Sequence, residues 1–135
     1  MTDGLPRLTV ARLAAAAGLT LLTSPASGER LLTGAYAADR MSDIISHADG
    51  DRLILTNLDG GQLLRAARLM EAPALCMVEG ATVRPEILEE AEGAGVALLV
   101  SPYGLFETCG MVWAAFCGIT ALPDDGAVAR GGTAP

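Results

Sequence analysis

The chain has 135 residues, which is enough for one domain with a buried core and too few for two ordinary domains. About half of the residues are apolar (51%), and nine arginines without any lysine stand against sixteen acidic residues, giving a net charge of -7. This acidic balance makes nucleic acid or an anionic membrane surface a poor partner, and the missing lysine excludes a Walker loop, a Schiff base and a lysine general base. No stretch reaches the ~20 apolar residues of a membrane span.

The first third of the chain predicts a helix over 9–17, a strand over 19–23, a turn in "SPASGE" and a strand over 30–36. A second helix follows in "ADRMSDIISHA". Its apolar residues recur at i, i+3, i+4 and i+7 and predict the inner face: Met41, Ile44, Ile45 and Ala48. The polar residues fall on another face: Asp39, Ser42, Asp43 and Ser46.

The remaining chain alternates apolar strands with helices: strands over 52–57, 72–78 and 96–100, and helices over 62–70, 85–94 and 105–117. Strands without apolar–polar alternation, separated by helices, are typical of a parallel sheet covered on both faces. We therefore predict an α/β fold, a three-layer α/β/α single domain with a mainly parallel sheet, over residues 1–120. Residues 121–135 have no apolar period, which predicts a disordered tail.

Three cysteines, Cys76, Cys109 and Cys117, occur without a C-x-x-C spacing. This pattern favours reduced thiols in a cytoplasmic protein over a disulfide or a metal site. The single histidine, His47, excludes a metal site built from several histidines. We predict a cytoplasmic protein without a bound metal or cofactor.

Polar residues predict a ligand-binding edge at the carboxyl ends of the parallel strands, where ligands of open α/β sheets bind. One part is the acidic helix start, which can bind a hydroxyl, an amine or a divalent cation, or can simply be the solvated face of a helix. The other is "TNLDGGQ", a strand end, glycine pair and helix start able to hold an anion, or simply a turn that caps a helix. The candidate ligand-binding residues are Asp39, Ser42, Asp43, Thr56, Asn57, Asp59, Gly60 and Gly61.

Parallel strands would gather Asp43, Asn57 and Gly61 into one rim. The matching ends of the next two strands add further candidates for the same edge: Glu79, Arg84, Ser101 and Tyr103. Asp59 would repel a phosphate unless a cation, Arg40 or Arg65 intervened.

The final helix places Phe106, Trp113 and Phe116 roughly on one side. These aromatic residues either complete the core or form an apolar strip for a partner subunit, and as an interface they predict a homodimer.

Four segments in order resemble the DRTGG domain: "GAYAADRMSDIISHA", "RLILTNLDGGQLLRAARLMEAPALCMVEG", "PEILEEAEGAGVALLVSPYG" and "LFETCGMVW". The naming pentapeptide is absent, and Gly104 and Leu105 stand where relatives often have Asp and Thr. The resemblance implies a fold like the N-terminal domain of HPr kinase, without an activity of its own. In relatives with CBS domains the module belongs to a dimeric regulatory region that binds adenine nucleotides.

The residues and the resemblance together predict a non-catalytic regulatory or ligand-binding domain that senses a nucleotide or small metabolite as a homodimer, with no catalytic residues. One alternative is an interaction or scaffold module that works through its C-terminal helix without a ligand. Another is a small metal-dependent phosphotransferase or hydrolase that uses Asp39 and Asp43 to hold the cation.

Overall fold

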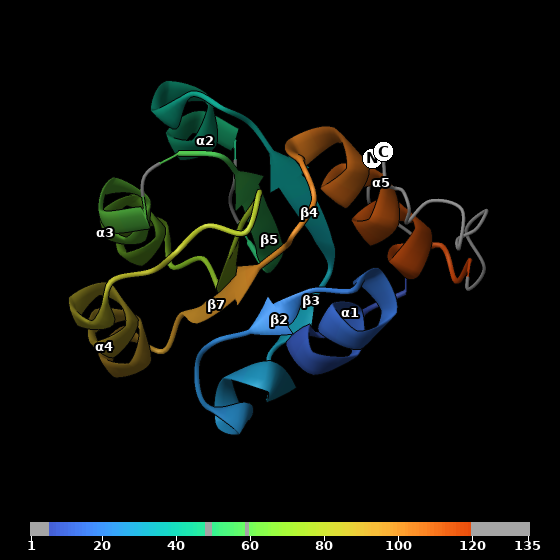
Figure 1. Ribbon diagram of the computed structural model, residues 1–135, viewed down its shortest axis with the longest axis horizontal. Helices are drawn as coiled ribbons and strands as arrows, with labels where there is room; N and C mark the ends of the chain where they lie inside the picture. Colours follow the sequence, from blue (N-terminus) through green and yellow to red (C-terminus); the bar gives the residue numbers. More distant parts are fainter. Residues whose placement is uncertain (1–5, 48–49, 59, 120–135) are drawn as a thin grey trace.

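A five-stranded sheet with the strand order β2-β7-β6-β5-β4 forms the middle layer of the fold (Figure 1). The structure is a computed structural model that describes residues 6–47, 50–58 and 60–119. The sheet strands are β2 (Thr20–Leu21), β4 (Gly34–Ala37), β5 (Arg52–Thr56), β6 (Ala74–Met77) and β7 (Ala97–Val100). Strands β4 to β7 are parallel, and β2 pairs with β7 in the antiparallel direction.

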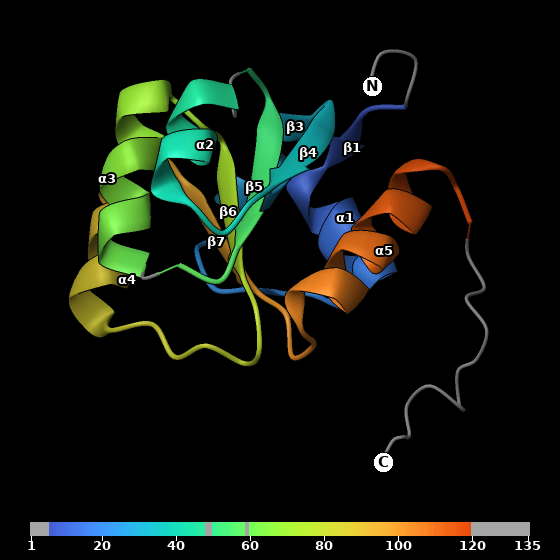
Figure 2. The same ribbon diagram turned by 90° about the horizontal axis from the view of Figure 1, so that it is seen from above.

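Helices cover both faces of this sheet (Figure 2). Helices α2 (Met41–His47), α3 (Gly60–Met70) and α4 (Pro85–Ala94) lie on one face, and α1 (Val10–Ala17) and α5 (Leu105–Phe116) lie on the other. A 3-10 helix, η1 (Pro25–Glu29), and a small antiparallel pair of β1 (Leu8–Thr9) and β3 (Leu31–Leu32) complete the described fold. The predicted three-layer α/β/α architecture with a mainly parallel sheet is confirmed.

Successive side chains of the central strands point to opposite faces of the sheet and so belong to two separate hydrophobic cores. In β5, Leu53 and Leu55 pack with α1 and α5, whereas Ile54 packs with α2, α3 and α4. In β7, Leu99 and Leu98 divide in the same way. Both faces are buried, which explains why the strand sequences are continuously apolar.

The sequence patterns placed the helices within three residues of their observed ends, because several ends carry clear signals. Thr9 caps α1 by accepting from the backbone N–H of Arg12 at 3.1 Å, and Pro85 is the first residue of α4. Gly18 and Gly95 close α1 and α4 in the left-handed conformation.

Two strand predictions were wrong in detail. The strand over 19–23 is only Thr20–Leu21, because Thr23 turns away to bond Ser27 and the backbone N–H of Leu98. The segment 30–36 is two strands in two different sheets, β3 and β4, which meet at Thr33.

Two predictions of side-chain orientation also need correction. Ile45 was expected inside, but its side chain is 55% exposed while Ile44 is fully buried. Phe116 was expected beside Trp113 as an interface residue, but it is only 2% exposed and belongs to the core. Three residues turn a helix by about 300°, so Phe116 is rotated by roughly 60° from Trp113 and reaches the sheet. Ala48 and the tail 121–135 lie outside the described residues.

Among the described residues, no helix combines the length and the apolar character needed to cross a lipid bilayer.

Candidate ligand-binding site

The loops that follow the four parallel strands lie along one edge of the sheet, as the topology predicted. They comprise residues 38–40 after β4, 57–58 after β5, 78–84 after β6 and 101–104 after β7. The last three leave the sheet on its lower side in Figure 2. The starts of α3 and α4 are therefore next to each other at this edge, and α5 begins beside them on the opposite face.

Backbone hydrogen bonds tie the β6 loop to the β7 loop. Glu79 and Gly80 both have positive φ, of 59° and 63°, and Ala81 N–H donates to Val78 C=O at 3.2 Å, which defines a type I′ turn. The N–H groups of this turn point across to the neighbouring loop: Glu79 donates to Tyr103 C=O and Gly80 to Ser101 C=O, both at 2.8 Å. The turn is thus held against the β7 loop, and this fixes the start of the segment 81–84 that leads into α4.

Buried hydroxyl groups hold the β7 loop itself. Thr108 donates to Gly104 C=O at 2.7 Å, so the Ser101 hydroxyl, 2.7 Å from Thr108 Oγ1, donates to Thr108. Ser101 Oγ in turn accepts from Tyr103 N–H at 3.1 Å. Both hydroxyls are fully buried. Ser101, predicted as a candidate for the ligand edge, therefore positions a loop.

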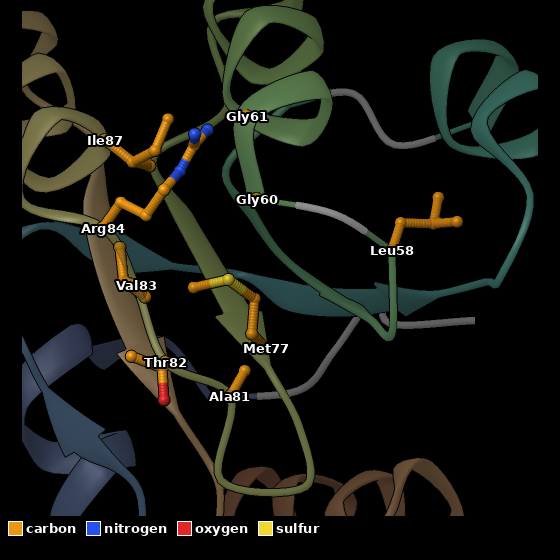
Figure 3. A pocket seen from close by; sticks show the side chains of 9 residues that line it. All are labelled: Leu58, Gly60, Gly61, Met77, Ala81, Thr82, Val83, Arg84 and Ile87. Atoms are coloured by element: carbon orange, nitrogen blue, oxygen red, sulfur yellow. The ribbon is translucent and has the colours of Figure 1, made fainter.

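A pocket of about 220 Å³ lies between the start of α3 and the segment that leads into α4 (Figure 3). It is lined by Leu58, Gly60, Gly61, Met77, Ala81, Thr82, Val83, Arg84 and Ile87. A side chain at position 60 would be a tight fit, because a Cβ there would lie 3.3 Å from Met77 Sδ and 4.0 Å from Ile87 Cγ2. Glycine at this position lets α3 start directly above the sulfur of Met77. Most of the lining side chains are apolar, and backbone and side-chain polar atoms supply about half of the exposed lining surface.

Arg84 contributes the positive charge of this pocket. It immediately precedes α4, its side chain is exposed, and its guanidinium points towards the turn of α3 that carries Gly61 (Figure 3). Within the described part of the chain no carboxylate pairs with it. The amino end of α3 adds the partial positive charge of a helix dipole on the same side. An apolar hollow with a cation at its mouth suits a ligand with an anionic group and an apolar body.

The pocket includes only part of the predicted site. Gly60 and Gly61 line it, as does Arg84, which was also expected at this edge. Thr56 is fully buried, and its Oγ1 accepts from Leu58 N–H at 3.2 Å, so this residue shapes the loop. Asn57 is exposed and does not line the pocket, and Asp59 lies outside the described residues.

The acidic start of α2 also lies outside the pocket. Asp39 and Ser42 are exposed, and Asp43 approaches Arg40 at 3.9 Å in a solvent-exposed pair. His47 stacks on Tyr36 with ring centroids 5.7 Å apart, and its Nδ1 lies 3.0 Å from Asp43 C=O. In the described residues, no three His, Cys, Asp or Glu side chains come together in a way that would hold a metal ion. This geometry agrees with the solvated-helix alternative.

Sequence reasoning missed the apolar lining of the pocket. Met77 and Ile87 have the pattern of core residues, and Leu58 that of a loop residue, so no local signal separates them from ordinary packing. The available clue was the length of the β6 loop, whose residues 81–84 reach back to the start of α3.

The thiols do not provide a reactive group at this site. Burial, with a smaller effect of neighbouring Cys109, raises the pKa of Cys76 to about 12, and burial also raises the pKa of Cys109. Both thiols therefore stay protonated at neutral pH, and the nucleophilic form is the thiolate. Cys117 is exposed near the end of α5.

A second hollow of about 280 Å³ lies at the opposite edge of the sheet, near the carboxyl ends of α3 and α4. Its arginines are already engaged: Arg30 donates to Gly95 C=O at 2.9 Å, and Arg68 pairs with Glu90 at 2.9 Å. The pocket beside Arg84 is thus the better candidate for an anionic ligand.

Fold and pocket together define an α/β/α domain with a small hollow at the carboxyl edge of its sheet. No family model matches the chain, and no curated protein matches it. Among solved structures, the chain is similar to the regulatory region of Clostridium perfringens pyrophosphatase, which comprises CBS and DRTGG domains and was crystallised with its activator, diadenosine tetraphosphate. The TM-score is 0.65 at 11% identity, over 80% of this chain and 47% of that one.

At this identity the likeness shows the fold alone, and the chain spans about half of the neighbour's length. The resemblance to the DRTGG domain thus has a counterpart in a structure that contains one. Membership of that family stays a prediction.

Proposed function

We propose that this chain is a non-catalytic regulatory domain of the DRTGG type that binds a small anionic metabolite, with a nucleotide as the first candidate, in the pocket beside Arg84. The observation that carries the proposal is the Arg84 guanidinium, which has no carboxylate partner among the described residues and points towards the start of α3 over a hollow lined mainly by apolar side chains. Ligand-sensing and a cytoplasmic location belong to the same proposal.

A nucleotide matches the chemistry of this hollow in two ways. Its phosphate is the anion that an arginine and a helix amino end bind well. Its base or ribose can pack on the apolar lining formed by Leu58, Met77, Val83 and Ile87. A volume of about 220 Å³ holds only one end of such a molecule, so the remainder would extend into solvent. The neighbour's complex with diadenosine tetraphosphate makes that compound a sensible test ligand.

The composition of the pocket favours binding over catalysis. Enzymes require positioned acids, bases or nucleophiles, and among the described lining residues only Thr82 and Arg84 carry polar side chains. Neither is an ordinary general base at neutral pH.

Isothermal titration calorimetry and thermal shift with adenosine, AMP, ATP and diadenosine tetraphosphate test this proposal. We expect at least one phosphate-bearing compound to bind, and the Arg84→Gln variant to bind it at least about tenfold more weakly, since a charge-assisted hydrogen bond is lost. Arg65→Gln is the matched control, because Arg65 is an exposed arginine of α3 that does not line the pocket.

Two results would contradict the proposal. One is the absence of binding by every compound at millimolar concentration. The other is equal affinity of the Arg84→Gln and Arg65→Gln variants for a compound that the unaltered chain binds.

The proposal includes a homodimer. The alternative function, an interaction module without a ligand, is favoured by one specific observation on α5, where Phe106 is 87% and Trp113 is 54% exposed. A chain that binds none of the compounds but self-associates through α5 would fit that alternative.

A further inference from the structure

One side of α5 presents an apolar strip to solvent. Phe106, Gly110, Trp113 and Cys117 follow one another at i, i+4, i+7 and i+11, and all four are exposed. These residues, called the α5 strip below, lie beside the face of the helix that carries Val112 and Phe116, which are buried in the core. Large exposed apolar side chains arranged in one line mark a surface that contacts another molecule.

Gly110, in the middle of the strip, has no role within the described fold. A Cβ at this position would have no atom within 4 Å, so the space is open and a larger side chain would fit. Glycine inside a helix is unfavourable relative to alanine. An open glycine in the middle of an exposed apolar strip leaves room for the close approach of a second backbone from outside.

The charge distribution points to a second copy of the same chain as the partner. Two chains with a net charge of -7 repel each other unless they meet through surfaces that carry few charges. Helix α1 carries one charged residue, Arg12, and α5 carries one, Glu107, whereas α4 alone carries four glutamates. The layer formed by α1 and α5 is thus the described helical face on which two acidic chains can meet with little repulsion.

We infer that two copies of the chain pair through antiparallel α5 helices that cross at Gly110. Phe106 stands four residues before Gly110 and Trp113 three residues after it, so a two-fold axis at Gly110 places Phe106 beside Trp113 of the partner subunit. The aromatic side chains of each helix then flank the gap above the glycine of the other. Such a self-complementary surface is what a two-fold interface requires.

Neighbouring surface extends this contact. The 12 residues of α5 form a helix about 18 Å long, which alone covers less than the ~800 Å² per partner of an ordinary stable interface. Helix α1 packs against α5, and its exposed residues include Ala15 and Ala16, whose small side chains allow close approach. The inference rests on the homodimer in the proposed function, but it is argued from residues outside the pocket, which lies on the other face of the sheet.

Analytical ultracentrifugation of the full chain at micromolar concentrations tests the pairing. We expect twice the chain mass of 13.8 kDa for the unaltered protein and the monomer mass for Gly110→Gln. Glutamine has the higher helix propensity, and its Cβ would meet no atom within 4 Å in the described chain, so the melting temperature of Gly110→Gln should not fall. Leu69→Gln is the matched control: Leu69 is 85% exposed, but on α3, and its loss should leave the dimer intact.

Trp113 gives a second readout at the contact itself, because it is the chain's only tryptophan. Its fluorescence should shift to shorter wavelength as the concentration of the unaltered chain rises, and the shift should be absent in Gly110→Gln. A Phe106→Glu variant, which places like charges in the contact, should also be monomeric.

The outcomes separate the two proposals. An unaltered chain that stays monomeric at every concentration would overturn both the homodimer and the α5 pairing, and would leave the pocket proposal intact. A dimer that persists in both Gly110→Gln and Phe106→Glu would overturn the α5 pairing alone. If the chain forms a dimer that Gly110→Gln disrupts, but binds none of the ligands, only the pocket proposal would be overturned.

Discussion

At the scale of single residues, the described interior holds four buried polar side chains, and all four carry hydroxyl groups: Thr23, Thr56, Ser101 and Thr108. Thr23 and Thr56 accept from backbone N–H groups of Leu98 and Leu58, and Ser101 bonds with Thr108. Each stands where the chain leaves a strand or enters a helix, so the hydroxyls satisfy backbone groups that regular structure leaves unpaired. Burial removes Thr56 and Ser101 from ligand chemistry, although their sequence positions suggested it.

Cys76 provides a prediction at this scale. Its pKa of about 12 in the folded state lies above the value of 9.0 expected for an unshifted thiol. Below pH 9 both states hold the proton, so the protonated thiol favours neither state. Between pH 9 and about 12 the unfolded chain releases the proton first, so the free energy of unfolding should fall by about 1.4 kcal/mol per pH unit for this group.

Urea denaturation at pH 8, 9 and 10.5 measures this effect. The Cys76→Ala variant lacks the thiol and should lose less stability over this range than the unaltered chain. Parallel pH dependences in the two proteins would contradict the assignment.

At the scale of elements, α5 and three other helices end with the same backbone hydrogen bond, which runs back five residues into the last turn; in α5 it joins Ile119 N–H to Ala114 C=O across Gly118. In the other three, Leu19 N–H donates to Ala14 C=O, Ala72 to Ala67 and Val96 to Ala91, at 2.9 to 3.0 Å. The residue in between needs a positive φ, and it is Gly18 in α1, Gly95 in α4 and Glu71, at 57°, in α3. The end of α3 is thus the strained one of the four.

Replacing Glu71 by glycine should therefore stabilise the protein by about 0.5–1 kcal/mol, since glycine adopts this conformation without a steric cost. Gly95→Ala is the reverse experiment at the equivalent position of α4, where a Cβ has open space around it, and should destabilise by about 1 kcal/mol. Urea unfolding followed by circular dichroism measures both. A Glu71→Gly variant less stable than the unaltered chain would show that the side chain has a role that outweighs the strain.

Helices with one apolar stripe had a predictable inner face, whereas α5 had predictable ends but not a predictable inner face. Of its twelve residues only Glu107 and Thr108 have polar side chains, and Thr108 is buried. A helix that is apolar on nearly every side gives no periodic signal to separate its inner from its outer face. Its packing against the sheet decides that Phe116 is inside and Phe106 outside.

At the scale of the whole molecule, the edge of the site was predictable but its contents were not. Parallel strands place all carboxyl ends together, which the alternation of strands and helices already indicated. A loop encloses a hollow only when it is long enough to reach a neighbouring element. Residues 78–84 after β6 reach back to α3, whereas the short segment 38–40 after β4 leaves Asp39 in solvent. Loop length and path follow from tertiary packing, so the acidic start of α2 looked more important than Arg84.

The two cores share one sheet, and we expect them to unfold together. Leu98 and Leu99 are neighbours in β7 that point into opposite cores, and neither is more than 1% exposed. Replacing either by alanine should cost about 2–5 kcal/mol. In both variants the fluorescence of Trp113, which lies on the face served by Leu99, should report the same urea midpoint as circular dichroism. A separate, unshifted fluorescence transition in Leu98→Ala would show that the two faces unfold independently.

The turn at Glu79 and Gly80 joins the two sides of the molecule mechanically. Its N–H groups are bonded to the carbonyls of Ser101 and Tyr103, and Ser101 is bonded through its hydroxyl to Thr108 in the first turns of α5. A ligand that displaces this turn would therefore break these bonds or carry the amino end of α5 with it. Occupancy of the pocket and self-association would then be thermodynamically linked, each altering the other's equilibrium constant by the same factor.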